Sequence, residues 1–183
     1  MPLPVHFLTW TTYGTWLPGD RRGWASAKSH APRDPAPRLE LYCRELLRAP
    51  PLALDPRQRV ACAAAIVETC AFRGWTLQAV NVRTTHVHAL IGAGEPSPRV
   101  LQALKAWATR RLRERAGVAT DRPVWSSAGS TRLVRESSDA RAALAYVLEG
   151  QGENLVPGAI RGEAAWVGQD DAAGHRRATP PGH

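Results

Sequence analysis

The sequence predicts an α+β domain in which helices flank a central antiparallel sheet. Three observations support this prediction: a β-branched and aromatic run near the start, two later strand-like runs separated by a tight turn, and apolar residues at helical spacing around them. The predicted order of elements is β, α, β, β, α, β, α, and 183 residues suffice for one domain with a buried core.

The first part of the chain combines one strand with a long irregular segment. Residues 5–13 read VHFLTWTTY, which is rich in strand-forming side chains and predicts a strand. Residues 20–38 are polar, basic and proline-rich and predict a loop, and a short helix is expected over residues 39–48. We therefore expect residues 20–55 to be a loop-rich insertion.

Two longer helices follow, with a pair of strands between them. Pro56 opens the first helix and Gly74 suits its end, whereas Pro98 lies in the first turn of the second. Residues 75–82 and 85–91 read as two strands joined by a tight turn. The expected apolar stripes are Val60, Ala63, Ala64, Val67 and Ala71 in the first helix, and Val100, Leu101, Leu104, Ala108 and Leu112 in the second.

The C-terminal part predicts one more strand and one more helix. Residues 130–135 form the expected strand, and a serine pair caps an alanine-rich helix that ends at Gly150. The single domain is expected to span residues 1–165. Residues 166–183 are polar and are predicted to be a disordered tail.

The chain is strongly basic. It has 24 Lys and Arg residues against 16 Asp and Glu, a net charge of +8 and a pI near 10.4. Such a charge favours an acidic partner, and nucleic acid is the first expectation, with a basic but unrelated enzyme as the alternative. The three cysteines contain no CxxC pair and predict reduced thiols in a cytoplasmic protein. No signal peptide or membrane span is expected.

Residues 83–91 read RTTHVHALI and place His86 and His88 one residue apart in a predicted strand. Side chains two apart in a strand share a face, so the two imidazoles can bind one metal ion or be ordinary strand histidines. Leu90 stands where a histidine-triad hydrolase would have its third histidine, and no additional ligands stand at the spacing of a structural zinc site. Two imidazoles with open coordination positions suit Mg²⁺ or Mn²⁺ beside a phosphate.

Tyr146 lies off the predicted apolar stripe of the last helix. At about 100° per residue, it projects roughly opposite the centre of that stripe. One interpretation is a surface tyrosine; the other is a nucleophile, because a phenolate can attack a phosphodiester and hold the strand covalently. The stripe itself consists of Ala140, Leu144, Val147 and Leu148.

Together, these segments resemble the single-tyrosine HUH transposases of insertion sequences, including the REP-associated tyrosine transposases. HUH denotes two histidines around a hydrophobic residue, which His86-Val87-His88 fits. The resemblance covers roughly residues 4–155. It continues in order through FLTWTTYGTWLPGDRRG, LKAWATRRL, VWSSAGST and AALAYVLEGQ, the last of which carries Tyr146.

The resemblance implies a ferredoxin-like or RRM-like fold and an enzyme that cleaves and rejoins single-stranded DNA. Tyr146 would form a 5′-phosphotyrosine link and free a 3′-hydroxyl, while His86 and His88 would bind Mg²⁺ or Mn²⁺. The implied substrate is single-stranded DNA with hairpin ends, in the cytoplasm and associated with the nucleoid. Monomers and homodimers both occur among relatives, and a domesticated hairpin-binding protein that no longer cleaves DNA is the alternative function.

The sequence departs from the family at the third metal ligand. The family often has a Gln one helical turn after the tyrosine, and here that position is Gly150. We expect Gln151 to serve as the ligand, with Glu149 as the alternative.

Several side chains are expected to contact DNA. Lys105, Arg110 and Arg113 lie on the polar side of the second long helix, for which an ordinary solvated face is the alternative. Trp125 is a candidate for base stacking, and Arg132 is expected to lie along the path of the strand, with Arg21, Arg22 and Arg135 as further candidates.

Overall fold

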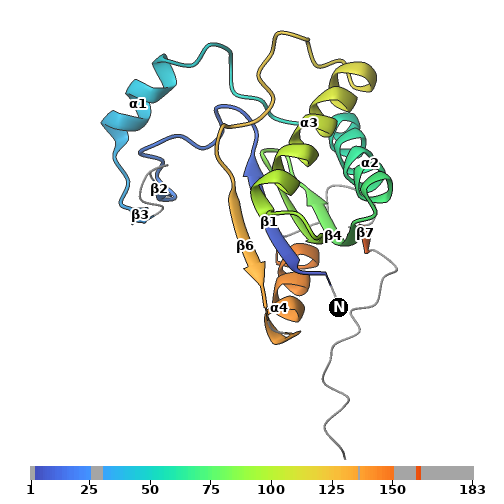
Figure 1. Ribbon diagram of the computed structural model, residues 1–183. Helices are drawn as coiled ribbons and strands as arrows, with labels where there is room; N and C mark the ends of the chain where they lie inside the picture. Colours follow the sequence, from blue (N-terminus) through green and yellow to red (C-terminus); the bar gives the residue numbers. More distant parts are fainter. Residues whose placement is uncertain (1–2, 26–30, 136, 151–159, 162–183) are drawn as a thin grey trace, which may run out of the picture.

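The computed structural model describes residues 3–25, 31–135, 137–150 and 160–161 (Figure 1). In these ranges five antiparallel strands form the main sheet, in the spatial order β6-β1-β5-β4-β7. The predicted α+β class with a helix-flanked antiparallel sheet is confirmed. The strands are β1 (Val5–Thr11), β4 (Thr76–Val82), β5 (His86–Gly92), β6 (Ser130–Val134) and β7 (Ile160–Arg161).

Helices cover both faces of this sheet (Figure 1). On one face, α2 (Pro56–Arg73) and α3 (Ser97–Arg115) pack over a large core that includes Trp10 from β1 and Ile91 from β5. On the other face, α4 (Ser137–Leu148) packs over a smaller cluster that includes Leu90. Because side chains alternate along a strand, neighbouring residues of β5 serve different layers.

The two ends of α2 follow from local sequence. Asp55 caps the N-terminus, where its side chain accepts a hydrogen bond from the backbone N–H of Gln58 and the Gln58 side chain accepts one from that of Asp55. Pro56 occupies the first turn, and Gly74 ends the helix with a φ of 66° in the left-handed region, which glycine adopts without strain. The predicted start and end of this helix are confirmed.

The predicted buried face of α2 is wrong. Val60 is half exposed and Ala71 is exposed, whereas only Ala63 of the predicted stripe is buried. The alanine-rich sequence has a weak apolar period, and the actual stripe includes cysteine and threonine side chains that count little in a hydrophobicity pattern. The buried residues are Arg59, Cys62, Ala63, Ala65, Ile66, Thr69 and Cys70. In α3, by contrast, all five predicted core residues are buried.

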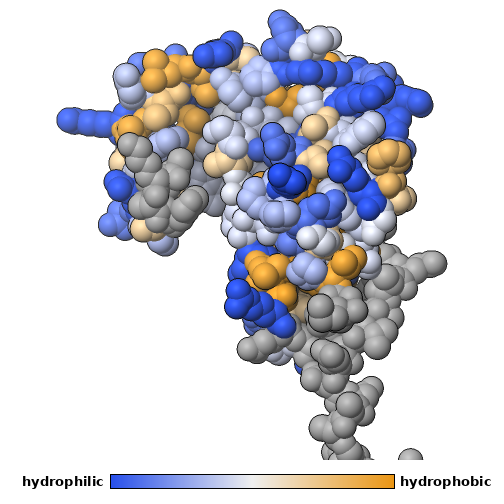
Figure 2. All heavy atoms as spheres, in the orientation of Figure 1, coloured by the Kyte–Doolittle hydropathy of each residue, from blue (hydrophilic) through white to orange (hydrophobic). Residues whose placement is uncertain are grey.

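The segment after β1 contains more structure than the predicted loop over residues 20–38. Two-residue strands β2 (Trp24–Ala25) and β3 (Pro32–Arg33) pair with each other, and α1 (Pro37–Glu45) begins and ends slightly before the predicted helix. α1 buries none of its side chains. Figure 2 shows hydrophobic residues on the surface over α1. The exposed large side chains of this helix include Leu41 and Tyr42.

The predicted tail over residues 166–183 lies outside the described residues. In the part of the chain that the structure describes, every helix is too short or too polar for a bilayer crossing.

The three thiols differ in burial and therefore in reactivity. Cys62 and Cys70 lie in the core, and burial raises the pKa of each thiol to about 12, whereas Cys43 is partly accessible. Because the thiolate is the reactive form, we expect a thiol reagent at pH 8 to modify one cysteine per native chain and all three in denaturant. Thiol counting with and without urea checks this; rapid modification of three thiols in the native protein would contradict the buried placement.

Candidate active site

His86 and His88 lie at the start of β5, on the sheet face that α4 covers in part. Their ring centroids are 4.9 Å apart, and the rings are nearly perpendicular, at 79°. His88 is buried and His86 is half-buried. The strand therefore places both imidazoles side by side, as the HxH spacing predicts.

Hydroxyl groups hold each imidazole at its Nδ1 atom. Thr9 lies directly opposite His88 in the β1–β5 register, and its Oγ1 is 2.9 Å from Nδ1 of His88. Thr85 Oγ1 is 3.3 Å from Nδ1 of His86. A neutral imidazole that donates its Nδ1–H to a hydroxyl keeps its lone pair on Nε2, the arrangement found in metal-bound histidines.

Helix α4 brings Tyr146 to the same face. Its ring centroid is 5.5 Å from that of His88 and 6.0 Å from that of Phe7, with an edge-to-face geometry in both cases. The Phe7 ring in turn lies parallel to that of His88 at 6.0 Å. Although Tyr146 is 47% exposed, it is not directed away from the sheet.

The predicted orientation of Tyr146, opposite the apolar stripe, is therefore wrong in detail. The stripe includes the buried Ala143 as well as Ala140, Val147 and Leu148. Residues three apart are neighbours on a helix surface, so the burial of Ala143 places Tyr146 at the edge of the packed stripe. From that edge the ring reaches the histidines while part of it stays exposed.

Asn81 fixes the end of α4 to the sheet. Its Nδ2 donates a 2.9 Å hydrogen bond to the carbonyl of Val147, the residue that follows Tyr146. Asn81 is buried on β4 and lies opposite His88 in the β4–β5 register. This contact holds the helix turn that carries the phenol next to the strand that carries the imidazoles.

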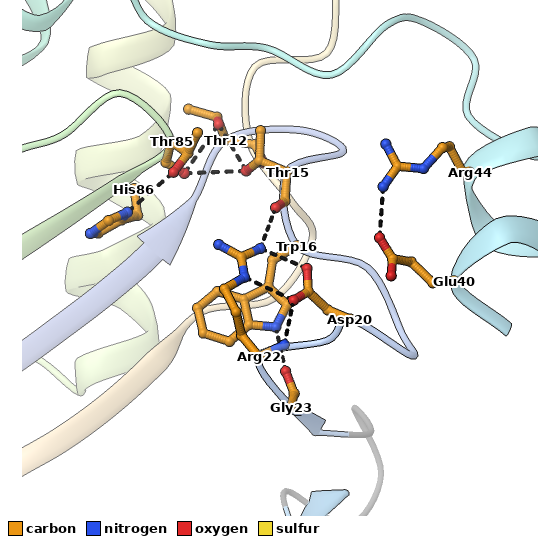
Figure 3. Close-up of polar contacts among 10 residues, drawn as sticks. All are labelled: Thr12, Thr15, Trp16, Asp20, Arg22, Gly23, Glu40, Arg44, Thr85 and His86. Atoms are coloured by element: carbon orange, nitrogen blue, oxygen red, sulfur yellow. Dashed lines mark hydrogen bonds and ion pairs between the residues drawn. The ribbon is translucent and has the colours of Figure 1, made fainter. Parts of the chain in front are cut away.

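Three threonines connect the loop after β1 to the histidine strand (Figure 3). The carbonyl of Thr85 accepts hydrogen bonds from the backbone N–H of Thr12 (2.8 Å), from Thr12 Oγ1 (3.1 Å) and from Thr15 Oγ1 (3.3 Å). Thr12 and Thr15 also contact each other through their hydroxyls at 3.1 Å. The residue before His86 is thereby fixed to the N-terminal loop.

Of the residues predicted to contact DNA, Arg132 is brought to this site. It lies opposite Phe7 in the β1–β6 register, and its Cζ is 5.6 Å from the centroid of the Phe7 ring. Its guanidinium is thus one ring away from Tyr146 and His88, on the same face of the sheet.

Lys105 of α3 and Trp125, in the loop before β6, form a structural unit on the sheet face that α2 and α3 cover. Lys105 Nζ donates to the carbonyls of Ser126 (2.6 Å) and Ala128 (3.3 Å), and burial lowers the pKa of the Lys105 ammonium. Trp125 Nε1 donates to the Lys105 carbonyl, and its ring packs edge-on against that of Trp10. These contacts secure the loop before β6; the roles of both residues in DNA binding stay predictions.

The structure does not bring Arg110 and Arg113 together with the histidines. Both lie on α3, which covers the opposite face of the sheet. Arg110 pairs with Glu114 at 2.7 Å, and Arg113 donates to the carbonyl of Arg122. A cavity of about 340 Å³ also lies between α2 and α3 and is not part of this site.

The third metal ligand is not placed by the described residues. Gln151, the predicted ligand, lies outside them. Within them, no group of three or more His, Cys, Asp or Glu side chains gathers around a common point, so Glu149 does not join the two histidines.

Sequence reasoning missed Thr9, Phe7 and Asn81. Each acts across strands or between a strand and a helix, and the register that brings it to the site is not encoded in local spacing. One pattern could have indicated Thr9 and Asn81: each is a hydrogen-bonding residue in a mostly apolar strand, and buried polar groups need partners.

The sequence matches no protein-family model and no curated protein. Several solved structures are similar to the chain, among them the following two. One is a REP-associated tyrosine transposase bound to a REP hairpin, with 14% identity, a TM-score of 0.46, and coverage of 82% of this chain and 67% of that one. The other is a provisionally assigned transposase of Deinococcus radiodurans R1, with 16% identity, a TM-score of 0.43, and coverage of 75% and 84% respectively. Both are named as transposases.

Proposed function

We propose that this chain cleaves and rejoins single-stranded DNA in a metal-dependent reaction that passes through a covalent bond to Tyr146. The observation that carries the proposal is the convergence of three rings on one face of the sheet: those of His86, His88 and Tyr146, with centroid separations of 4.9 and 5.5 Å between neighbours. A nucleophile beside two potential metal ligands suits metal-assisted phosphoryl transfer to a side chain.

The two imidazoles fit a divalent cation. A threonine hydroxyl lies at Nδ1 of each ring, and in the tautomer that carries its proton on Nδ1, Nε2 is the electron-pair donor to the cation. When bound there, Mg²⁺ or Mn²⁺ would polarise a non-bridging oxygen of the scissile phosphate. Gln151 is the proposed third ligand.

Tyr146 acts as the nucleophile. Its Oη attacks the phosphorus, the O–P bond to the tyrosine forms, and the bond from phosphorus to the 3′ oxygen breaks. The phenol proton is lost and the departing 3′ oxygen takes up a proton, so the products are a 5′-phosphotyrosine and a free 3′-hydroxyl. Attack by a 3′-hydroxyl on the phosphotyrosine reverses the reaction and rejoins the DNA.

The substrate proposed is single-stranded DNA with a hairpin at its end, as the family resemblance implies. The net charge of +8 supports a polyanionic partner, and Arg132 supplies a cation beside the proposed reaction centre. Contacts of this kind to phosphate give affinity and salt dependence without sequence preference.

Covalent capture tests the function. The full chain is incubated with Mn²⁺ and a library of hairpins that carry randomised single-stranded flanks, then denatured, and the protein-bound DNA is sequenced and the attachment site mapped by mass spectrometry. An adduct on Tyr146 supports the proposal. Cleavage without an adduct would replace it with a water-dependent nuclease, and binding without either would replace it with a hairpin-binding protein that no longer cleaves DNA.

Gly150 gives a prediction about the placement of Tyr146. A Cβ atom at position 150 would lie 2.9 Å from Cδ2 of the Tyr146 ring and 3.0 Å from its carbonyl oxygen. We therefore expect Gly150→Ala to displace the phenol and lower the rate of adduct formation by about 10- to 100-fold, since displacements near 1 Å have effects of this size. Rates at saturating DNA, with DNA affinity measured in parallel, check this; an unchanged rate would show that the ring position is not critical.

A further inference from the structure

An exposed indole lies in the loop that follows β1. Trp16 is 44% exposed, yet its ring is held in place on two sides. Its Nε1 donates a 2.9 Å hydrogen bond to the carbonyl of Gly23, and the Cζ of Arg22 lies 4.6 Å from the ring centroid. A large aromatic ring that is both exposed and fixed is suited to receiving a flat ligand.

The cation behind the ring is itself fixed. Arg22 forms hydrogen bonds to both carboxylate oxygens of Asp20, at 2.8 and 2.6 Å, and its Nη2 donates to the carbonyl of Thr15 at 2.8 Å. Asp20 is buried, and its hydrogen bond with Arg22 lowers the pKa of this carboxyl group. Arg22 therefore remains over the Trp16 ring as a positioned, charged group and leaves the rest of the ring surface as the accessible part.

This loop is joined to the active site by continuous polar contacts (Figure 3). Arg22 contacts Thr15, the hydroxyl of Thr15 contacts the carbonyl of Thr85, and the hydroxyl of Thr85 contacts Nδ1 of His86. Trp16 directly follows Thr15 in the chain. The loop that carries the ring is thus fixed to the residue that precedes His86.

We propose that Trp16, backed by Arg22, stacks an unpaired base of the DNA strand whose phosphate reaches His86 and His88. The inference rests on the proposed function and adds a base-binding position to it. Stacking on an exposed aromatic ring suits an unpaired base, whose faces are accessible, and tolerates any base identity. The position would select single-stranded over duplex DNA next to the cleavage site.

Equilibrium binding is the first test. A fluorescent hairpin oligonucleotide with a single-stranded arm is titrated with protein in the absence of divalent metal, so that binding is measured apart from cleavage. We expect Trp16→Ala to weaken binding by about 5- to 100-fold and Trp16→Phe to recover most of the loss. Equal affinity of wild type and Trp16→Ala would overturn the proposal.

Trp107 provides a matched control. It is 40% exposed and also has an arginine over its ring, with the Cζ of Arg110 at 5.4 Å from the centroid, but it lies on α3 at the opposite face of the sheet. We expect Trp107→Ala to leave affinity for the same oligonucleotide unchanged. An equal loss in both variants would show that exposed tryptophans contribute without a specific base-binding position.

An abasic scan then distinguishes stacking from a structural role of the loop. Removing one base at a time from the single-stranded arm should reveal one or two positions at which wild type loses affinity and Trp16→Ala loses no more. Equal losses at every position in both proteins would overturn the proposal even if Trp16→Ala binds weakly. If wild type loses affinity at specific positions where Trp16→Ala loses no more, but no adduct forms with Mn²⁺, the stacking position stands and the proposed function fails. If an adduct forms but the two proteins lose affinity equally at every position, the proposed function stands and the stacking position fails.

Discussion

Tyr146→Phe is expected to abolish the covalent protein–DNA adduct, with a loss of about three orders of magnitude or more in its rate of formation, as is typical when a nucleophile is removed. The substitution deletes one oxygen atom. The ring and its edge-to-face contacts with His88 and Phe7 remain, so folding and DNA binding should be unchanged. Denaturing electrophoresis with labelled DNA measures the adduct, and thermal denaturation checks the fold.

The other tyrosines of the chain supply the control. Tyr42 is exposed on α1, and Tyr42→Phe removes the same atom at a position remote from the histidines. It should form the adduct at the wild-type rate. Undiminished adduct in Tyr146→Phe would refute the assignment of the nucleophile, and adduct lost only in Tyr42→Phe would transfer the role to that residue.

His88→Ala and His86→Ala are expected to remove metal-dependent cleavage while leaving the chain folded. Each removes one of the three proposed protein ligands, and we expect losses of about 100-fold or more, since even the outer partners of metal ligands are worth about 10- to 100-fold. Adduct formation as a function of Mn²⁺ concentration is the measurement. Full activity in either variant at low Mn²⁺ would contradict the metal site.

His6 is the matched control for these variants, because its imidazole has a structural role. It is buried, its Nδ1 lies 2.8 Å from Ser97 Oγ and its Nε2 lies 2.9 Å from the carbonyl of Ala93. We expect His6→Ala to lower the free energy of unfolding by about 1–3 kcal/mol through lost buried hydrogen bonds. At temperatures well below its melting point, this variant should form the adduct normally. The opposite pattern, a stable but inactive His6→Ala, would move the chemistry to the other face of the sheet.

Periodicity predicted the elements well where apolar residues are large. All five expected core positions of α3 are buried, since leucine and valine at helical spacing mark a face clearly. In α2 the same reasoning chose the wrong face, because alanine is small enough to be tolerated on any side of a helix. Val60, which lies within the predicted stripe, is 50% exposed.

The site was predicted in part for a similar physical reason. His86 and His88 lie within one strand, so their shared face follows from local geometry alone. Thr9 and Asn81 lie on the neighbouring strands, opposite His88, and only the strand register identifies them as its neighbours. Tyr146 was predicted to project opposite the stripe, but it lies at the edge of the stripe, and its approach to His88 depends on how closely α4 packs at Ala143.

The alternation along β5 has a consequence for how the site can change. His86 and His88 point to one face, while Val87, Ala89 and Ile91 enter the core on the other. A slip of one residue between β5 and its neighbours would turn both imidazoles into the core and expose Val87, and all apolar contacts of the strand would be lost. An insertion or deletion in this strand would therefore prevent folding whether or not it affected the chemistry of the site. Any descendant of this chain that retains both histidines and folds with the same core places its two imidazoles on the same face of the sheet, whether or not it still acts on DNA.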